Sequence, residues 1–209
     1  MRNWPFFDLS VTTPRLELRL PSLDDLDELA DRAAEGIHDA GSMPFAFPWS
    51  DTGPAERGRS TLQFHFRTWG ELSPAAWNLA FVAVFEGEVV GTQGVQATDF
   101  PVTREVLTGS WLGRRFQGRG IGTEMRRAAL QFAFAGLGAT DAVTSAFEDN
   151  HASLSVTAKL GYRDDGTAVH NRQGTRTMLR RFRLTSDDWA DQPDVEIHNL
   201  APCLPILGL

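Results

Sequence analysis

Gln117-Gly118-Arg119-Gly120-Ile121-Gly122-Thr123 is a glycine-rich stretch near the middle of this chain. It follows an apolar run, Val106 to Leu112, that is typical of a strand, and it opens a helical pattern that extends to about Ala135. Three glycines within five residues let the backbone approach a ligand without clashes of Cβ atoms. A helix N-terminus adds unpaired N–H groups and the positive end of a dipole. The stretch therefore predicts an anion-binding loop between a strand and a helix.

The charge around this loop supports a polyanionic ligand. Residues 114–127 hold five arginines and one glutamate, a net charge of +4, whereas the whole chain carries −7. Positive charge concentrated against the overall trend attracts anions locally. The negative total argues against nonspecific nucleic-acid binding, so we expect no nucleic-acid partner, and it favours a cationic acceptor such as an amine.

Two common phosphate-binding motifs do not fit the loop. Gly113 and Gly118 have the spacing of a P-loop, but Arg119 and Gly120 stand where lysine and serine or threonine are needed. In the dinucleotide fingerprint, Met125 stands where the third glycine is required. A glycine-rich turn that merely caps a helix is the structural alternative. A nucleotide-hydrolysing enzyme is the weakest functional alternative, and Mg²⁺-dependent ATP turnover would be its mark.

The pattern Q-x-x-G-x-G, formed by Gln117, Gly120 and Gly122, resembles the GNAT acyl-CoA N-acyltransferases. In that family the loop holds the pyrophosphate of coenzyme A through backbone N–H groups. A second segment, Asn150-His151-Ala152-Ser153 followed by Lys159-Leu160-Gly161-Tyr162, resembles the family's N-x-x-S … K-L-G-[FY] segment. This likeness is closest to the branch that acetylates ribosomal-protein N-termini. The two motifs stand in the family's order, with a predicted helix and strand between them.

The resemblance implies an α/β fold of mixed α+β type, the GNAT fold, with a central mixed β-sheet flanked by helices. Strand and helix patterns that alternate and then end in a hairpin favour the same class. We expect a polar turn at residues 170–174 between the last two strands. The patterns predict strands at 15–20, 77–85, 88–95, 106–112, 142–146, 162–167 and 175–184, and helices at 22–37, from 54, at 121–135 and at 150–161.

The same resemblance implies acetyl-CoA, or another acyl-CoA such as succinyl-CoA, as co-substrate, with no metal. The acceptor would be a primary amine, carried by a small molecule or by the N-terminus of a peptide or protein. Asn150 is equally suited to a simple helix N-cap. The residues carried over for CoA binding come from the loop, the end of the preceding strand and the second motif: Leu112, Gly113, Gln117, Gly118, Arg119, Gly120, Ile121, Gly122, Thr123, Asn150 and Ser153.

Transfer from an acyl-CoA needs no covalent enzyme intermediate, because a neutral amine attacks the thioester and the thiolate leaves. Many family members protonate that thiolate with a tyrosine seven residues after the asparagine, but Thr157 stands there. The ribosomal-protein branch assigns the acid role to a serine at the position of Ser153. For the base, Leu107 replaces the family's strand glutamate, and Glu105 lies on the same strand face. Ser153 and Glu105 are therefore the catalytic candidates.

Several alternatives stay open at this stage. Ser110 could hold a water that accepts the amine proton, and His170 lies near the place where the branch has a carboxylate. The missing strand glutamate motivates a rival function, a non-catalytic acyl-CoA-binding or regulatory module. An acidic acyl group such as succinyl would need a cation, and Arg104, His170 and Arg172 are available in the sequence. The proline-flanked aromatic loop at residues 44–49 either borders the acceptor site or covers an edge of the core.

With 209 residues, 42% of them hydrophobic, the chain can bury a sizeable core as one domain, which we place at residues 1–184 with a C-terminal tail at 185–209. The apolar residues 204–209 must pack on the chain's own core or on a partner subunit, so a homo-oligomer is an open expectation. The single Cys203 allows no intrachain disulfide, which suits a reducing cytoplasm. Neither a membrane span nor a signal peptide is indicated, so we expect a cytoplasmic protein without membrane contact.

Overall fold

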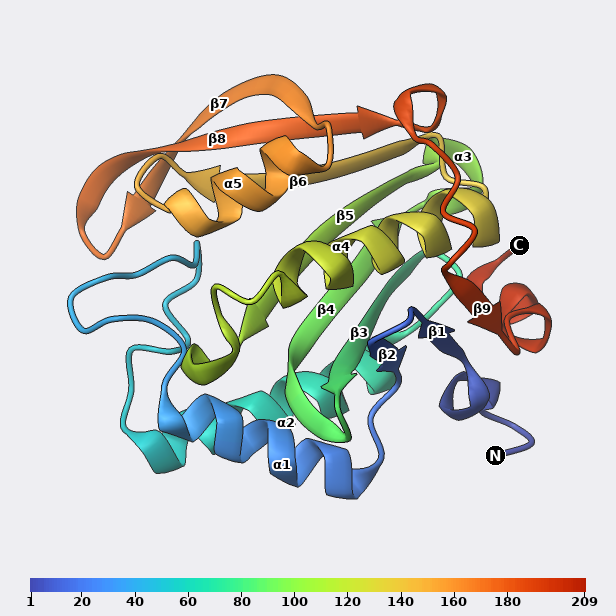
Figure 1. The fold of residues 1–209 in the computed structure, drawn as a ribbon, viewed down its shortest axis with the longest axis horizontal. Coiled ribbons are helices and arrows are strands. Elements are labelled where there is room, and N and C mark those ends of the chain that lie inside the picture. The colour runs from blue at the N-terminus through green and yellow to red at the C-terminus, as the bar shows by residue number, and fades with distance from the viewer.

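A nine-stranded sheet organises the computed structural model, which describes residues 1–209 (Figure 1). The strand order is β7-β8-β6-β5-β4-β3-β2-β1-β9, and only β5 and β6 pair in parallel. The predicted mixed sheet flanked by helices is therefore confirmed. The strands are β1 (Ser10–Thr12), β2 (Leu16–Arg19), β3 (Ala76–Phe85), β4 (Glu88–Thr98), β5 (Glu105–Leu112), β6 (Asp141–Phe147), β7 (Arg163–Arg172), β8 (Thr175–Thr185) and β9 (Glu196–His198).

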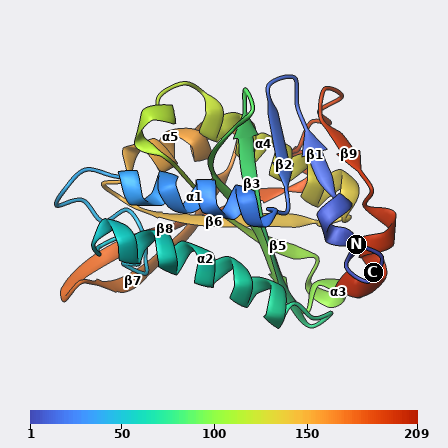
Figure 2. The ribbon, with the colours of Figure 1, turned by 90° about the horizontal axis from the view of Figure 1, so that it is seen from below.

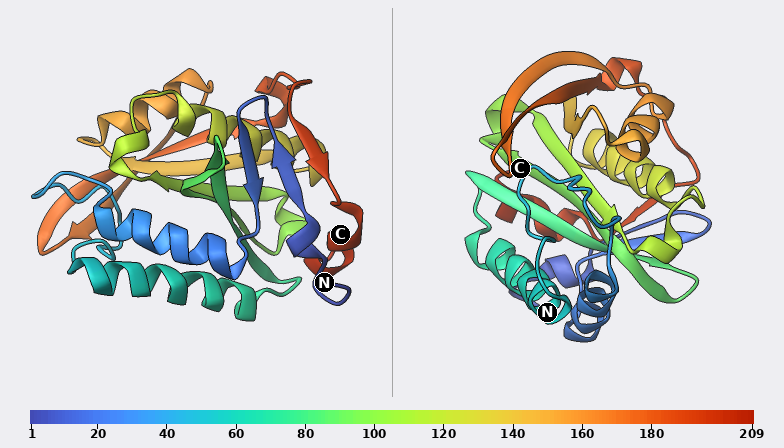
Figure 3. Two further views of the ribbon diagram at one scale, coloured as in Figure 1. Left: turned by 60° about the horizontal axis from the view of Figure 1, so that its bottom comes forward. Right: turned by 90° about the vertical axis from the view of Figure 1, so that its left-hand side faces the viewer.

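The helices form a layer on each face of the sheet. Figure 3 shows α1 and α2 on one side and α4 and α5 on the other, and Figure 2 shows α1 beside α2. A short helix, α3, connects β4 to β5. None of these helices combines the length and the apolarity that a bilayer-crossing helix needs. Their bounds are α1 (Leu23–Glu35), α2 (Pro54–Glu71), α3 (Phe100–Thr103), α4 (Ile121–Gln131, continued by a π-helical turn at Phe132–Gly136) and α5 (His151–Lys159).

Polar side chains cap the starts of α1 and α5. At the start of α1, the Ser22 hydroxyl accepts from the Asp25 N–H at 3.1 Å, and the Asp25 carboxylate accepts from the Ser22 N–H at 3.0 Å. This reciprocal pair satisfies two donors that a helix N-terminus otherwise leaves unpaired. Asn150 caps α5 with a single bond, because its Oδ1 accepts from the Ser153 N–H at 3.1 Å.

The closing hairpin is longer than its sequence pattern predicted. We expected a polar turn at residues 170–174, but β7 pairs with β8 as far as Arg172 and Thr175. The turn itself consists of Gln173 and Gly174, both with positive φ (50° and 85°), which suits the twist of a two-residue hairpin. Most of β7 is exposed on both faces, so its residues carry no apolar alternation that could have marked the strand.

The C-terminal segment after Thr185 packs on the chain's own core. Strand β9 pairs antiparallel with β1 and so forms one edge of the sheet. Cys203 and Leu207 are fully buried in the main hydrophobic cluster, and Leu204, Ile206 and Leu209 pack against it. The apolar residues 204–209 therefore pack on the chain's own core, which was one of the two expected places.

Candidate active site

The main candidate cavity lies where β5 and β6 part. Its volume is about 610 Å³, which is within the usual range for small-molecule sites. The α1–α2 loop, β5, the start of α4, β6 and the start of α5 all contribute to its wall. The structure therefore brings both sequence motifs to one place. Among the residues predicted for CoA binding, those that line the cavity are Leu112, Gln117, Gly122, Asn150 and Ser153.

The two parallel strands are paired over only part of their length. Register pairs run from Glu105 with Asp141 to Leu107 with Val143 and then stop. The Gly113 N–H donates to a β4 carbonyl at 2.9 Å, so strand alternation turns the backbone groups of Leu112 away from β4 and toward the gap. Backbone groups on this open edge can hydrogen-bond the amides of an extended ligand.

The predicted loop has the geometry of an anion cradle. Gly118 and Gly120 have φ values of 74° and 80°, a region that side chains with a Cβ rarely adopt, so glycine is required at both. No side chain caps α4, which leaves the N–H groups of Ile121, Gly122 and Thr123 unpaired at the helix start. The side chain of Ile121 is fully buried, so this residue offers only its backbone to a ligand. An anion placed here would satisfy these donors.

Gln117 fixes the cradle to its neighbours. Its Nε2 donates to the Leu112 carbonyl at 2.9 Å and to the Ile37 carbonyl at 2.8 Å, and so links β5, the cradle and the segment after α1. Its amide group is thus engaged within the chain. Gly113, which was carried over with Leu112, is buried beside Phe116 and lies outside the cavity wall.

The arginines of residues 114–127 differ in how they are neutralised. Arg119 has no carboxylate partner: its guanidinium lies over the rings of Phe85 at 5.0 Å and Phe116 at 6.0 Å, and its side chain is exposed. It is free to meet a phosphate at the cradle. Three others already form ion pairs: Arg114 with Asp39, Arg115 with Glu88, and Arg127 with Asp194.

Arg126 was missed by sequence reasoning. It lies one helical turn after Gly122, lines the cavity and is 4% exposed. Its Nη1 donates to the Thr144 hydroxyl at 3.3 Å and its Nη2 to the Ser110 hydroxyl at 3.2 Å, while Nε has no partner. The signal in the sequence was the spacing, since a residue four positions after Gly122 shares its helix face.

Asn150 and Ser153 lie together at the start of α5. The Asn150 Oδ1 is used for the helix cap, and its Nδ2 lies 3.5 Å from the Pro44 carbonyl. The Ser153 hydroxyl makes no hydrogen bond within the chain and is half-buried in the cavity wall. Ser153 is therefore available to a ligand, whereas the oxygen of Asn150 is not. Thr157, one turn further on, is 1% exposed and its hydroxyl has no partner.

Tyr162 is part of the core. Its hydroxyl lies 3.2 Å from the Thr108 hydroxyl, and burial raises its pKa, an effect that the nearby Arg126 guanidinium opposes. The only tyrosine of the chain is therefore a neutral structural group at neutral pH. The aromatic loop contributes differently, because Pro44 and Phe45 line the cavity while Trp49 packs on Trp111 at 5.6 Å.

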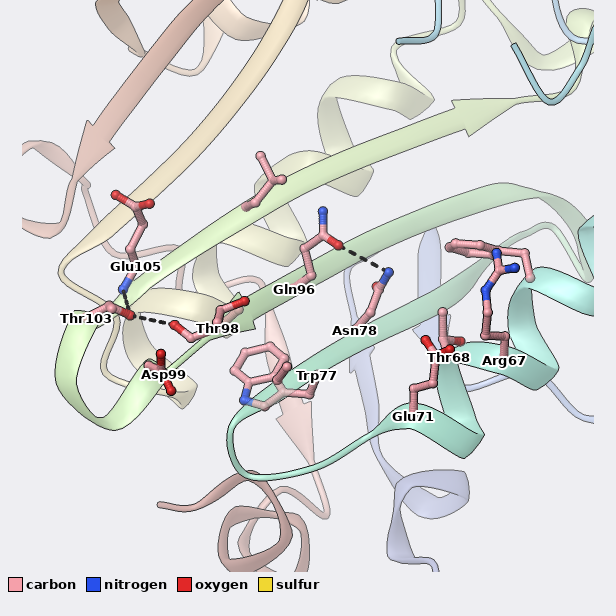
Figure 4. A pocket seen from close by; sticks show the side chains of 14 residues that line it. Arg67, Thr68, Glu71, Trp77, Asn78, Gln96, Thr98, Asp99, Thr103 and Glu105 are labelled. Atoms are coloured by element: carbon pink, nitrogen blue, oxygen red, sulfur yellow. Dashed lines mark hydrogen bonds between the residues drawn. The ribbon is translucent and has the colours of Figure 1, made fainter. Parts of the chain in front are cut away.

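A second cavity of about 680 Å³ lies on the α2 side of the sheet (Figure 4). Residues of α2, β3, β4 and the start of β5 line it, and Gln96 and Leu107 line both cavities. The two cavities therefore adjoin across β4 and β5. Figure 4 shows Gln96 and Asn78 pointing toward each other across the strands. The Asn78 Nδ2 donates to the Gln96 Oε1 at 3.4 Å.

Glu105 belongs to this second cavity and not to the first. Its carboxylate accepts from Arg183 at 2.7 Å, and the same guanidinium contacts Asp141 at 2.9 Å and Asp165 at 3.3 Å. The structure thus does not bring Glu105 to the cavity wall that holds Ser153. A catalytic role for Glu105 stays a prediction, and this placement disfavours it.

The chain resembles known proteins in sequence and in fold. A family model described as an acetyltransferase (GNAT) domain matches residues 15–163. Mycobacterium smegmatis RimJ in complex with CoA-disulfide has a TM-score of 0.76 at 17% identity, over 91% of this chain and 93% of that chain. RimL, a ribosomal L7/L12 alpha-N-protein acetyltransferase in complex with coenzyme A, gives 0.69 at 18% identity, over 85% and 97%.

A third solved structure, from Vibrio cholerae, has been assigned as a ribosomal-protein-serine acetyltransferase. That chain has a TM-score of 0.64 at 22% identity, over 86% of this chain and 98% of its own length. At these identities the likeness to solved structures concerns the fold alone.

Proposed function

This chain belongs to the GNAT acetyltransferase family, and on that premise we propose that it acetylates the N-terminal amine of a peptide or protein with acetyl-CoA. Family membership supports the coarser statement, an acyl-CoA-dependent N-acetyltransferase. One observation carries the finer proposal: a single cavity joins Gly122 at the uncapped start of α4, an open strand edge and the Ser153 hydroxyl, and it adjoins an acidic cavity.

The donor fits the main cavity together with the cradle that adjoins it at Gly122. The N–H groups of Ile121, Gly122 and Thr123, helped by the exposed Arg119, would hold the pyrophosphate. The open edge of β5 near Leu112 would bond the amides of the pantetheine arm. Acetyl remains the default acyl group. Arg172, one cation considered for an acidic acyl group, is paired with Asp149 at 2.8 Å.

Acetyl-CoA supplies the thioester whose acyl group is transferred. We assign to Ser153 the donation of a proton to the departing sulfur, and its free hydroxyl in the cavity wall supports this role. Glu105 is ion-paired in the adjoining cavity, so we assign the amine proton to solvent water. The wall around the reacting groups orients them, which accounts for a large part of the acceleration in such reactions.

The second cavity supports a cationic acceptor. Three carboxylates, Glu71, Asp99 and Glu105, line it against one arginine, Arg67, and Figure 4 shows all four side chains around it. A protonated amine would be attracted to this cavity. It would then lose its proton to water and reach the main cavity past Leu107, which lines both cavities. Two solved structures with this fold are described as acetyltransferases of ribosomal proteins, which favours a polypeptide acceptor.

The acceptor proposal is tested with a panel of amines. Short peptides that differ in their first residue are compared with spermidine, putrescine and free amino acids, and the acetylated atom is located by mass spectrometry. We expect acetylation at the peptide N-terminus, at rates that depend on the first residue. If small amines are acetylated faster than every peptide, the acceptor part of the proposal is wrong while the family-level activity stands. A cytoplasmic location is part of the same proposal and rests on the single, unpaired Cys203.

A further inference from the structure

Arg126 is a buried cation without a counter-ion. Its guanidinium donates to the neutral hydroxyls of Thr144 and Ser110, at 3.3 and 3.2 Å, and lies near the neutral hydroxyl of Tyr162, but it forms no ion pair. Arginine keeps its proton in proteins, so the positive charge is permanent. Of its five N–H donors, those two bonds leave others unused, and Nε has no partner. A buried charge in this state is costly for the fold unless a ligand compensates it.

The charge faces the space between the parted strands. Ser110 belongs to β5 and Thr144 to β6, and both line the main cavity together with Arg126. Gly122 lies four residues before Arg126, or about 6 Å along the helix axis, on the same face of α4. The guanidinium therefore lies about one helical turn beyond the start of α4, between Ser110 of β5 and Thr144 of β6.

No carboxylate of the surrounding elements neutralises this charge. Asp39 is paired with Arg114, and Asp149 is paired with Arg172. From the end of α5 the nearby titratable group is the Tyr162 hydroxyl, which is neutral at neutral pH. The charged and titratable side chains that line the cavity besides Arg126 are His38, Asp39, Asp149, His151 and Arg172.

We propose that Arg126 stabilises the negative charge that develops on the sulfur of coenzyme A during transfer. This inference rests on the proposed function and deepens it. In the step, the amine nitrogen forms a bond to the thioester carbon, and the carbon–sulfur bond breaks with its electron pair on sulfur. The amine proton goes to water. The phosphates stay at the cradle and neutral backbone groups suffice for the pantetheine amides, so the thiolate is the anion for which a buried cation is needed.

The role of Arg126 is compatible with that of Ser153. A fixed positive charge lowers the pKa of a neighbouring thiol, so the sulfur can leave as a thiolate before a proton arrives. Ser153 then supplies or relays that proton. Arg126 would act on the pKa of the leaving group, and Ser153 on its protonation, which makes the two separable by experiment.

The test compares Arg126→Met and Arg126→Lys with wild type. Arg127→Met is the matched control, because Arg127 is adjacent on α4 but pairs with Asp194 at 2.6 Å, away from the cavity. The ultraviolet absorbance of the thiolate in bound CoA is followed against pH. We expect the wild-type and control proteins to lower the pKa of the CoA thiol by at least about 1, Arg126→Lys to keep part of that effect, and Arg126→Met to lose it.

Turnover and stability complete the test. Arg126→Met should reduce kcat by on the order of 10²-fold, as the loss of a group that stabilises developing charge does. The KM for acetyl-CoA should change less than about threefold. The melting temperature of Arg126→Met should equal or exceed that of wild type, because an unpaired buried charge has been removed.

Three results would overturn the proposal. An unchanged thiol pKa in Arg126→Met would remove Arg126 from the leaving-group chemistry. A melting temperature that falls together with activity would show a structural role only. A preference for succinyl-CoA over acetyl-CoA that Arg126→Met abolishes would assign the cation to a carboxylate of the acyl group. If wild type binds CoA but acetylates no amine, the proposed function fails, yet the thiol measurement still decides the role of Arg126.

Discussion

The hydroxyl of Thr144 donates a hydrogen bond to the main-chain carbonyl of Thr108 at 3.0 Å, at the point where β5 and β6 cease to pair. The Thr108 hydroxyl in turn donates to the Val143 carbonyl at 3.4 Å. These side chains take over from the backbone ladder as the strands diverge. These two hydrogen bonds therefore hold β5 and β6 together at the point where the strands begin to diverge.

Gly122→Val should weaken CoA binding while the fold is kept. An added Cβ at Gly122 would meet the Leu112 side chain at 3.5 Å, an ordinary contact, but it would stand where phosphate oxygens approach the helix N–H groups. Calorimetric titration should show a loss of at least about tenfold in affinity. Gly70→Val, at an open helical position in α2, is the control. Affinity within about threefold of wild type would refute the cradle. Gly120 is a poorer test, because its φ of 80° would strain any side chain.

Ser153→Ala should lower turnover by on the order of 10²-fold, the low end for a positioned proton donor, with little change in CoA affinity. Ser155→Ala on the exposed side of α5 serves as the matched control. The measurement is steady-state thiol release together with titration of CoA. Unchanged turnover would mean that the sulfur is protonated by solvent alone.

Glu105→Gln separates two roles for this carboxylate. Because Glu105 is paired with Arg183 and lines the second cavity, which we propose attracts the acceptor, we expect a several-fold rise in KM for a cationic acceptor. The ratio of mutant to wild-type kcat should be flat across pH. A kcat defect that grows at low pH and recovers toward the amine pKa would instead establish Glu105 as the proton relay.

His65 should make stability depend on pH. Burial lowers the pKa of its imidazole from 6.5 to about 4, and neither ring nitrogen has a partner. The unfolded chain therefore binds the proton more readily than the folded one, so this contribution is present above pH 6.5 and is lost as the pH falls toward 4. The loss amounts to roughly 3 kcal/mol at most. Denaturant unfolding of His65→Phe should show a flatter pH dependence, and a profile identical to wild type would contradict this.

The sequence predicted those parts of the site that depend on local backbone chemistry. Gly118 and Gly120 have positive φ, and Asn150 caps α5, as their residue types require. The sequence did not predict the features that arise from tertiary packing. Arg126 reads as one more surface arginine in a basic stretch, and only the approach of β5 and β6 to α4 buries it.

The placement of Glu105 shows the same limit. The alternation of residues along β5 correctly placed Glu105 and Leu107 on one face of the strand. It did not reveal that Glu105 lines the second cavity and not the cavity that holds Ser153. Its partner Arg183 comes from β8, 78 residues later, so no local pattern could reveal the ion pair. Long-range pairs of exposed charges leave no periodic signal in the sequence.

The proposed function requires that the cavity between β5 and β6 transfers an acetyl group to a free polypeptide N-terminus. The initial rate of CoA release from acetyl-CoA is therefore measured with one peptide in two forms, N-terminally free and N-terminally acetylated. We predict release with the free form, one acetyl group added per CoA, and background release with the blocked form. Tight CoA binding with background release for free forms of every first residue tested would contradict the claim.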